Sequence, residues 1–134
     1  MTGAQDRLHR VPAPGEWSPG MVLVHMADNE IVYSFGLRLL LTSGRAQLPA
    51  FDAGAWVERF ADLDADAKQS IARWRPLREA NLRVLETLEE EEWLLAGWQA
   101  GDQQEVSVRR LTEQLAGHDR RHLDQLRAAL APGG

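Results

Sequence analysis

The spacing of apolar residues in positions 111–130 constrains the fold of this chain more than any other feature. Leucines and alanines recur there at helical intervals, and a step of about 100° per residue places them on one stripe. His118 and His122, one turn apart, fall on the same stripe. The opposite side carries Glu113, Arg120 and Arg127. The stretch therefore predicts a helix that directs two imidazoles into the protein.

The amino-acid composition favours a helical domain. The 134 residues are 44% apolar and 26% charged. Leu, Ala, Glu and Arg, which have high helix propensity, outnumber the β-branched residues that a sheet-rich fold would need. A chain of this length can bury a substantial core as one domain. We therefore expect an all-α fold in which residues 1–134 form a single helical bundle domain.

Charge and cysteine content exclude several kinds of partner and site. The net charge of −5 at pH 7 and the lack of a basic cluster argue against a nucleic-acid partner. Without cysteine, the chain has no disulfide, no thiolate metal ligand and no cysteine nucleophile. The longest strongly apolar run, residues 31–42, is too short to span a bilayer, and no secretory signal is visible. We expect a cytoplasmic protein that does not bind membranes.

An extended segment and a long helix are predicted for the first third of the chain. Residues 1–17 contain two prolines and little apolar periodicity, so we expect an extended N-terminal arm with at most one short turn at residues 6–9. Ser18 is a favourable N-cap, and Pro19 suits the first helical position, where its missing N–H costs nothing. The helix is predicted to run to about Leu41.

His25 lies in this first long helix. The helical wheel places its side chain inward, and it places Glu30 and Arg38 on the far side. Burying three imidazoles among leucines without partners would cost about 1 to 3 kcal/mol each, and a shared metal ion would remove that cost. The pattern predicts a metal site formed by His25, His118 and His122. The alternative is that all three are core histidines with hydrogen-bond partners.

Two further helices are predicted between the ends of the chain. Asp52 can cap a short helix at residues 53–63. Asp64 or Asp66 can cap a longer helix at residues 67–88, where leucines recur at amphipathic spacing. Both helices would pack an apolar side against the bundle.

Local signals set the remaining boundaries. Pro76 predicts a kink at residues 72–75, or two abutting helices, because it removes one backbone hydrogen bond. A run of four acids followed by two glycines predicts a loop over residues 89–104. Ser107 can cap the last helix, and residues 132–134 are expected to be a frayed tail.

Several polar residues are candidates for roles beside a metal. Asp28 and Asp119 are predicted catalytic residues for proton transfer, with Asn29 as a further polar neighbour. Each has a simpler interpretation: Asp28 as a carboxylate packed near the mouth of the bundle, Asp119 as a solvated or cross-helix paired group. Arg78 either binds a substrate carboxylate or forms an exposed salt bridge. Three neutral imidazoles leave a metal its full charge and an open position, as in catalytic sites.

Three stretches together resemble the DinB/YfiT-like superfamily of four-helix-bundle metalloenzymes. They are Gly-Glu-Trp-Ser-Pro at residues 15–19 followed by His25, His-Asp-Arg-Arg-His at residues 118–122, and a weaker similarity at residues 77–82. The ordered combination carries the resemblance, which covers nearly the whole chain.

The resemblance implies a divalent metal ion, most often nickel or zinc, held by His25, His118 and His122. It also implies a small-molecule substrate and, in some relatives, a low-molecular-weight thiol cosubstrate such as bacillithiol, mycothiol or glutathione. The leading hypothesis is a thiol-dependent transferase. The alternative is a non-catalytic bundle that a metal stabilises or that binds a small molecule. A carboxylate-rich di-metal bundle is disfavoured, because no Glu-x-x-His pair occurs on two separate helices.

The sequence departs from the family at its start and in one loop. Family members usually have a helix of some twenty residues before the Gly-Glu-Trp-Ser stretch, and about half that length is present here. Residues 100–104 stand where the family often has a His-Pro pair. We therefore expect a bundle with a shortened or missing first helix, which leaves an apolar groove of the kind that marks an interface.

The shortened first helix predicts a homodimer in which each copy covers the groove of the other. Light scattering coupled to size-exclusion chromatography should give twice the chain mass at micromolar concentration. A stable monomer under those conditions would contradict the prediction.

Overall fold

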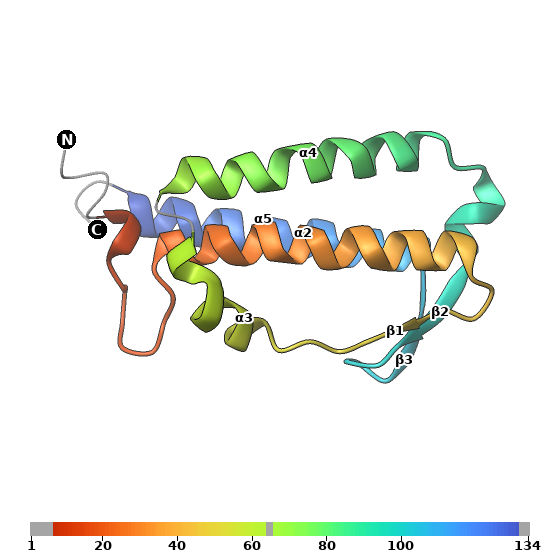
Figure 1. The fold of residues 1–134 in the computed structure, drawn as a ribbon, viewed down its shortest axis with the longest axis horizontal. Coiled ribbons are helices and arrows are strands. Elements are labelled where there is room, and N and C mark those ends of the chain that lie inside the picture. Colours follow the sequence, from red (N-terminus) through yellow and green to blue (C-terminus); the bar gives the residue numbers. More distant parts are fainter. Residues whose placement is uncertain (1–6, 64–65, 132–134) are drawn as a thin grey trace.

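The computed structural model describes residues 7–63 and 66–131. Three long helices lie side by side along its long axis (Figure 1): α2 (Pro19–Thr42), α4 (Ala67–Glu86) and α5 (Val108–Leu130). Helix α2 packs against both α4 and α5. A shorter helix, α3 (Ala53–Phe60), continues into the 3₁₀ turn η1 (Ala61–Leu63) and contacts α2. The predicted long helices are therefore confirmed.

Each of these helices begins at a side-chain cap that the sequence predicts. The cap oxygens accept hydrogen bonds from the backbone N–H three residues later, at 3.0 to 3.3 Å. The caps are Ser18 for α2, Asp52 for α3, Asp66 for α4 and Ser107 for α5. Asp64, the other candidate for α4, lies outside the described residues, as do residues 1–6 of the arm and the tail at 132–134.

The structure also tests the short turn predicted in the N-terminal arm and the kink or break predicted at Pro76. Residues 7–9 are helical, which agrees with the short turn expected there. Helix α4 continues through Pro76 as one element, so the alternative of two abutting helices is excluded. A single lost backbone hydrogen bond does not break a helix whose neighbours hold it on either side of the proline.

A small three-stranded sheet corrects the expectation of an all-α fold. After α4, the 3₁₀ turn η2 (Glu90–Leu94) leads into the hairpin β2 (Ala96–Gln99) and β3 (Gln104–Ser107), where a loop was predicted. Strand β1 (Gln47–Leu48) pairs in parallel with β2, and β2 pairs antiparallel with β3. The sheet closes one end of the helices (Figure 1).

Gly97 explains why this stretch forms a strand. A side chain at position 97 would collide with the backbone oxygen of Ala46 and with Leu40. Its absence lets β2 approach β1, where Trp98 N–H donates to the Ala46 oxygen at 2.9 Å. The glycine that suggested a turn in the sequence therefore permits close strand pairing.

The main apolar core lies where α2, α5 and the sheet meet. Its buried members are Tyr33, Leu37, Leu40, Ala46, Leu48, Val106, Val108 and Leu115. These residues belong to α2, to α5, to β1 and the residue before it, and to β3. The sheet is therefore part of the core and packs this end of α2 against α5.

A buried polar network joins α2, α4 and α5 on the side of α2 that faces α4. Glu30 of α2 is completely buried and accepts hydrogen bonds from Arg78 at 2.8 and 3.0 Å and from Asn81 at 2.8 Å. Arg78 also pairs with Asp119 of α5. The prediction that Glu30 faces away from the protein is wrong, because α4 covers that side of α2. Arg78 is likewise part of a largely buried salt bridge and not of an exposed one.

Replacing Arg78 by Met is expected to destabilise the fold by about 3 to 5 kcal/mol, because two buried carboxylates then lose their cation. Urea unfolding at pH 7 measures the change. The matched control is Arg127→Met, which breaks an exposed pair with Asp124 at 3.5 Å and should cost less than about 1 kcal/mol. Equal unfolding midpoints for the Arg78 variant and the unmodified protein would contradict the prediction.

Candidate metal centre

The packing of α2 against α5 brings three histidine rings together. His25 lies in the second turn of α2, and His118 and His122 lie on successive turns of α5. The ring centroids are 4.4 to 4.9 Å apart, and one nitrogen from each ring lies within 4.8 Å of the others. The convergence that the sequence predicts is therefore present. Trp17, just before α2, packs its ring against His25 with centroids 4.9 Å apart.

The environment of the cluster favours neutral imidazoles. Burial, together with the nearby His118 and His122, lowers the pKa of His25 to about 4. Burial is also the main cause that lowers the pKa of His122. A ring that stays neutral in mildly acidic solution keeps a lone pair available for a metal ion.

The donor set fits a divalent ion of the zinc or nickel kind. The Nε2 atoms of His25 and His118 are 2.7 Å apart. Nitrogen ligands of a tetrahedral zinc site are about 3.3 Å apart, so a modest side-chain rotation would place an ion there. Nδ1–H of His122 donates a hydrogen bond to Gln125 Oε1 at 2.9 Å. The lone pair of Nε2 is then available for a metal ion.

Polar groups also surround the other nitrogen of His118. Its Nδ1 lies 3.4 Å from the Asn29 amide nitrogen and 3.8 Å from a carboxylate oxygen of Asp119. Burial alone would raise the pKa of Asp119, but the neighbouring His118 and Arg78 lower it overall. Asp119 is therefore an ionised, cross-helix paired group that can orient His118. This agrees with the interpretation of Asp119 as a cross-helix paired group.

Asp28 is also buried and paired across helices. It is 5% exposed, and one carboxylate oxygen lies 3.2 Å from Arg73 of α4. The histidine cluster does not include it as a ligand. A catalytic role for Asp28 or Asp119 stays a prediction.

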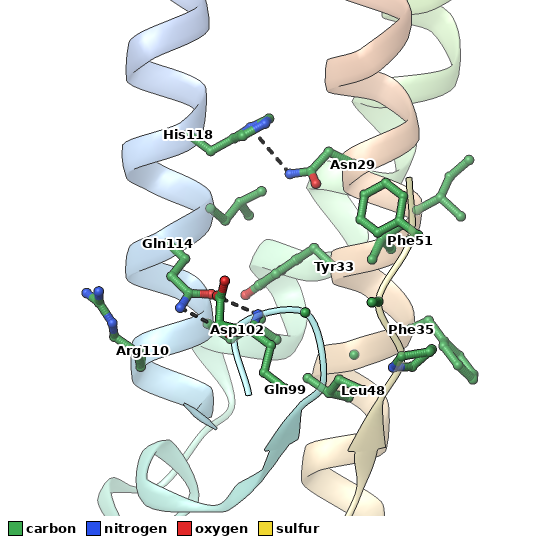
Figure 2. Close-up of a pocket in the computed structure, with 18 of the residues that line it drawn as sticks. Asn29, Tyr33, Phe35, Leu48, Phe51, Gln99, Asp102, Arg110, Gln114 and His118 are labelled. Carbon is green, nitrogen blue, oxygen red and sulfur yellow. Dashed lines mark hydrogen bonds between the residues drawn. The ribbon is translucent and has the colours of Figure 1, made fainter. Parts of the chain in front are cut away.

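A cavity of about 750 Å³ adjoins the cluster, and the sequence analysis did not find it. It lies between α2 and α5, and His118 and Asn29 form one end of it (Figure 2). The connection after β1 and the β2–β3 turn supply the other walls, through residues such as Phe51 and Asp102. Helical periodicity carries no signal for such a space, because two irregular connections define it.

The fold and the cluster together define a helical bundle with a three-histidine site, and comparisons with known proteins agree with this class. The model of the DinB superfamily matches residues 4–126, so the chain belongs to that superfamily. The expected family is thereby confirmed.

A solved structure supports the fold. The chain is similar to YfiT from Bacillus subtilis, which is described as a probable metal-dependent hydrolase with an unusual four-helix bundle topology. The TM-score is 0.77 at 20% sequence identity, over 92% of this chain and 72% of YfiT. No match was found among the curated proteins. Within the described residues, no helix is long and apolar enough to cross a membrane.

Titration of chelator-treated protein with zinc should show one binding site per chain. His25→Ala, His118→Ala and His122→Ala should each weaken binding by more than about 100-fold, since loss of even an outer-shell partner costs about 10- to 100-fold. His9→Ala is the matched control, because His9 is exposed and outside the cluster, and it should bind like the unmodified chain. Calorimetry and elemental analysis give affinity and stoichiometry. Unchanged zinc binding in all three cluster variants would refute the site.

Proposed function

We propose that this chain is a divalent-metal-dependent enzyme that transfers a low-molecular-weight thiol to a small electrophilic molecule. The observation that carries the proposal is that three imidazoles from two helices converge at the end of a cavity of small-molecule size. His118 belongs to both features. A molecule in the cavity therefore reaches the histidine cluster.

Burial lowers the pKa of His25 and His122, which favours their neutral, metal-binding form. A divalent ion held by His25, His118 and His122 would supply an open position with its full positive charge, which lowers the pKa of a bound thiol or water. Asp119 and Asn29 hold the ring of His118 in orientation, and Gln125 does the same for His122. The surrounding burial excludes water from His25.

The charge state of the nearby carboxylates favours thiol transfer. Hydrolysis of an ester or amide benefits from a general base beside the attacking water. Asp119 is paired with Arg78, which lowers the pKa of its carboxyl and makes it a weak base. A thiol gives its proton to solvent and acts as a thiolate without such a base. Its sulfur then bonds to the electrophilic carbon, and the leaving group departs with the bonding electron pair.

Hydrolysis is the second candidate. It is the activity described as probable for YfiT, whose fold this chain shares. The observation in its favour is the position of Asp119, whose carboxylate lies 3.8 Å from the His118 ring. The identity of the metal ion as nickel or zinc, the homodimer and the cytoplasmic location are also part of our proposal.

The transferase proposal predicts metal-dependent consumption of thiol. Protein loaded with zinc or nickel should accelerate the reaction of bacillithiol, mycothiol or glutathione with monochlorobimane, measured by fluorescence. Chelator-treated protein and the His118→Ala variant should fall to the uncatalysed rate. The His9→Ala variant should keep full activity. Hydrolysis of a nitrophenyl ester with no reaction of any thiol would favour the second candidate.

A non-catalytic role for the metal predicts a different result. If the ion only holds the helices together, a chelator should lower the melting temperature by many degrees. If it is catalytic, the fold should survive the chelator and turnover should be lost, since the polar network and the core hold α2 and α5 together without it. Thermal unfolding with and without chelator distinguishes the two.

A further inference from the structure

We propose that the cavity between α2 and α5 binds the electrophilic substrate, and that this substrate is an uncharged, mainly apolar molecule with at least one hydrogen-bonding group. The inference rests on the proposed function and names the substrate class for it. It comes from the walls of the cavity, which differ in character from the histidine cluster at its end (Figure 2).

The size and position of the cavity suit a small organic molecule. Its volume of about 750 Å³ falls within the range of about 300 to 1,000 Å³ that is typical of ligand pockets. It runs along α5 from His118 towards the β2–β3 turn, where Gln99 and Gln114 lie close together (Figure 2). A bound molecule would therefore have one end at the candidate metal centre and its body between the two helices.

The interior of the cavity is apolar. Its buried lining comes from Tyr33, Gly36, Leu48 and Leu115. The Tyr33 hydroxyl is already hydrogen-bonded to Thr112 at 2.8 Å, so the ring presents mainly its carbon atoms. Phe51 of the connection after β1 and Trp56 of α3, whose ring centroids are 4.9 Å apart, add a further apolar wall. An apolar body is what such walls bind most favourably.

The charged residues of the lining are all at its rim. Asp102, Arg110 and Arg121 are exposed. Figure 2 shows Arg110 directed away from the space between the helices. A charged group bound away from the His118 end would therefore lose its hydration without gaining a buried counter-ion, which is costly. An anion would also meet the carboxylate of Asp102.

Neutral amides supply the polar groups inside. Gln99 and Gln114 form two reciprocal hydrogen bonds of 3.1 and 3.2 Å, which tie the hairpin to α5. Each amide keeps one donor and one acceptor position beyond this pair. Asn29 adds another amide at the His118 end. These groups can orient a carbonyl, hydroxyl or amide of a ligand.

The uncharged, mainly apolar interior of the cavity suits one of the two substrates of the proposed reaction better than the other. Bacillithiol, mycothiol and glutathione are polar, and a cavity with an uncharged interior suits them poorly. We therefore assign the cavity to the electrophile.

A matched pair of fluorescent probes tests the ligand class. N-phenyl-1-naphthylamine is neutral and apolar with one N–H donor, and 8-anilino-1-naphthalenesulfonate has the same ring system with an added negative charge. The neutral probe should bind one molecule per chain and saturate. The anionic probe should bind at least about tenfold more weakly, because its charge has no buried partner.

Two tryptophan substitutions test the location. Ala50 lines the cavity, is exposed and faces Gly101 of the β2–β3 turn, so Ala50→Trp fills the space without disturbing the core. Ala55 is exposed on α3 and does not line the cavity, so Ala55→Trp is the matched control. The affinity for the neutral probe should fall by at least about tenfold in Ala50→Trp and should be unchanged in Ala55→Trp.

The same samples are titrated with zinc and measured by light scattering. Loss of the probe in Ala50→Trp with unchanged zinc binding supports the proposal. Equal affinity for the two probes, equal binding by both tryptophan variants, or a dimer whose formation excludes the probe would overturn it. If the neutral probe binds selectively but zinc does not bind, the ligand class stands and the proposed enzymatic function fails.

Discussion

The enclosure of α2 is the constraint on which the rest of the structure depends. Helix α4 covers one side of α2, α5 covers another, and the short α3 contacts it as well. Because α2 is covered on several sides, it presents chemically different groups to different neighbours. His25 meets α5, and Glu30 meets α4. A candidate metal centre and a buried ion-pair network therefore occupy opposite sides of the same helix.

Arg78 connects these two sides. It holds Glu30 of α2 and Asp119 of α5, and Asp119 in turn lies beside the ring of His118. Breaking such a buried network leaves uncompensated charge, which costs far more than an exposed pair. These contacts help to set the position of α5 relative to α2, and with it the separation of His25 from His118 and His122.

Sequence patterns predict the long helices, their caps and the three histidines, because capping and amphipathic periodicity are local properties. They fail for Glu30, since a helix covered on several sides has no single polar face that a helical wheel could identify. They also fail for the strands around Gly97, whose close approach to Ala46 depends on a partner fifty residues away. The cavity is missed for the same reason, because residues from separate connections form its walls.

Helices carry the histidine cluster and connections form much of the cavity, which affects how this architecture can evolve. The imidazoles sit on rigid helices, whereas residues 48–51 and 99–104 build much of the cavity wall. Connections tolerate substitution and insertion better than packed helices do. The selectivity of the cavity for a ligand can therefore change by remodelling two short surface segments while the histidine cluster is inherited intact.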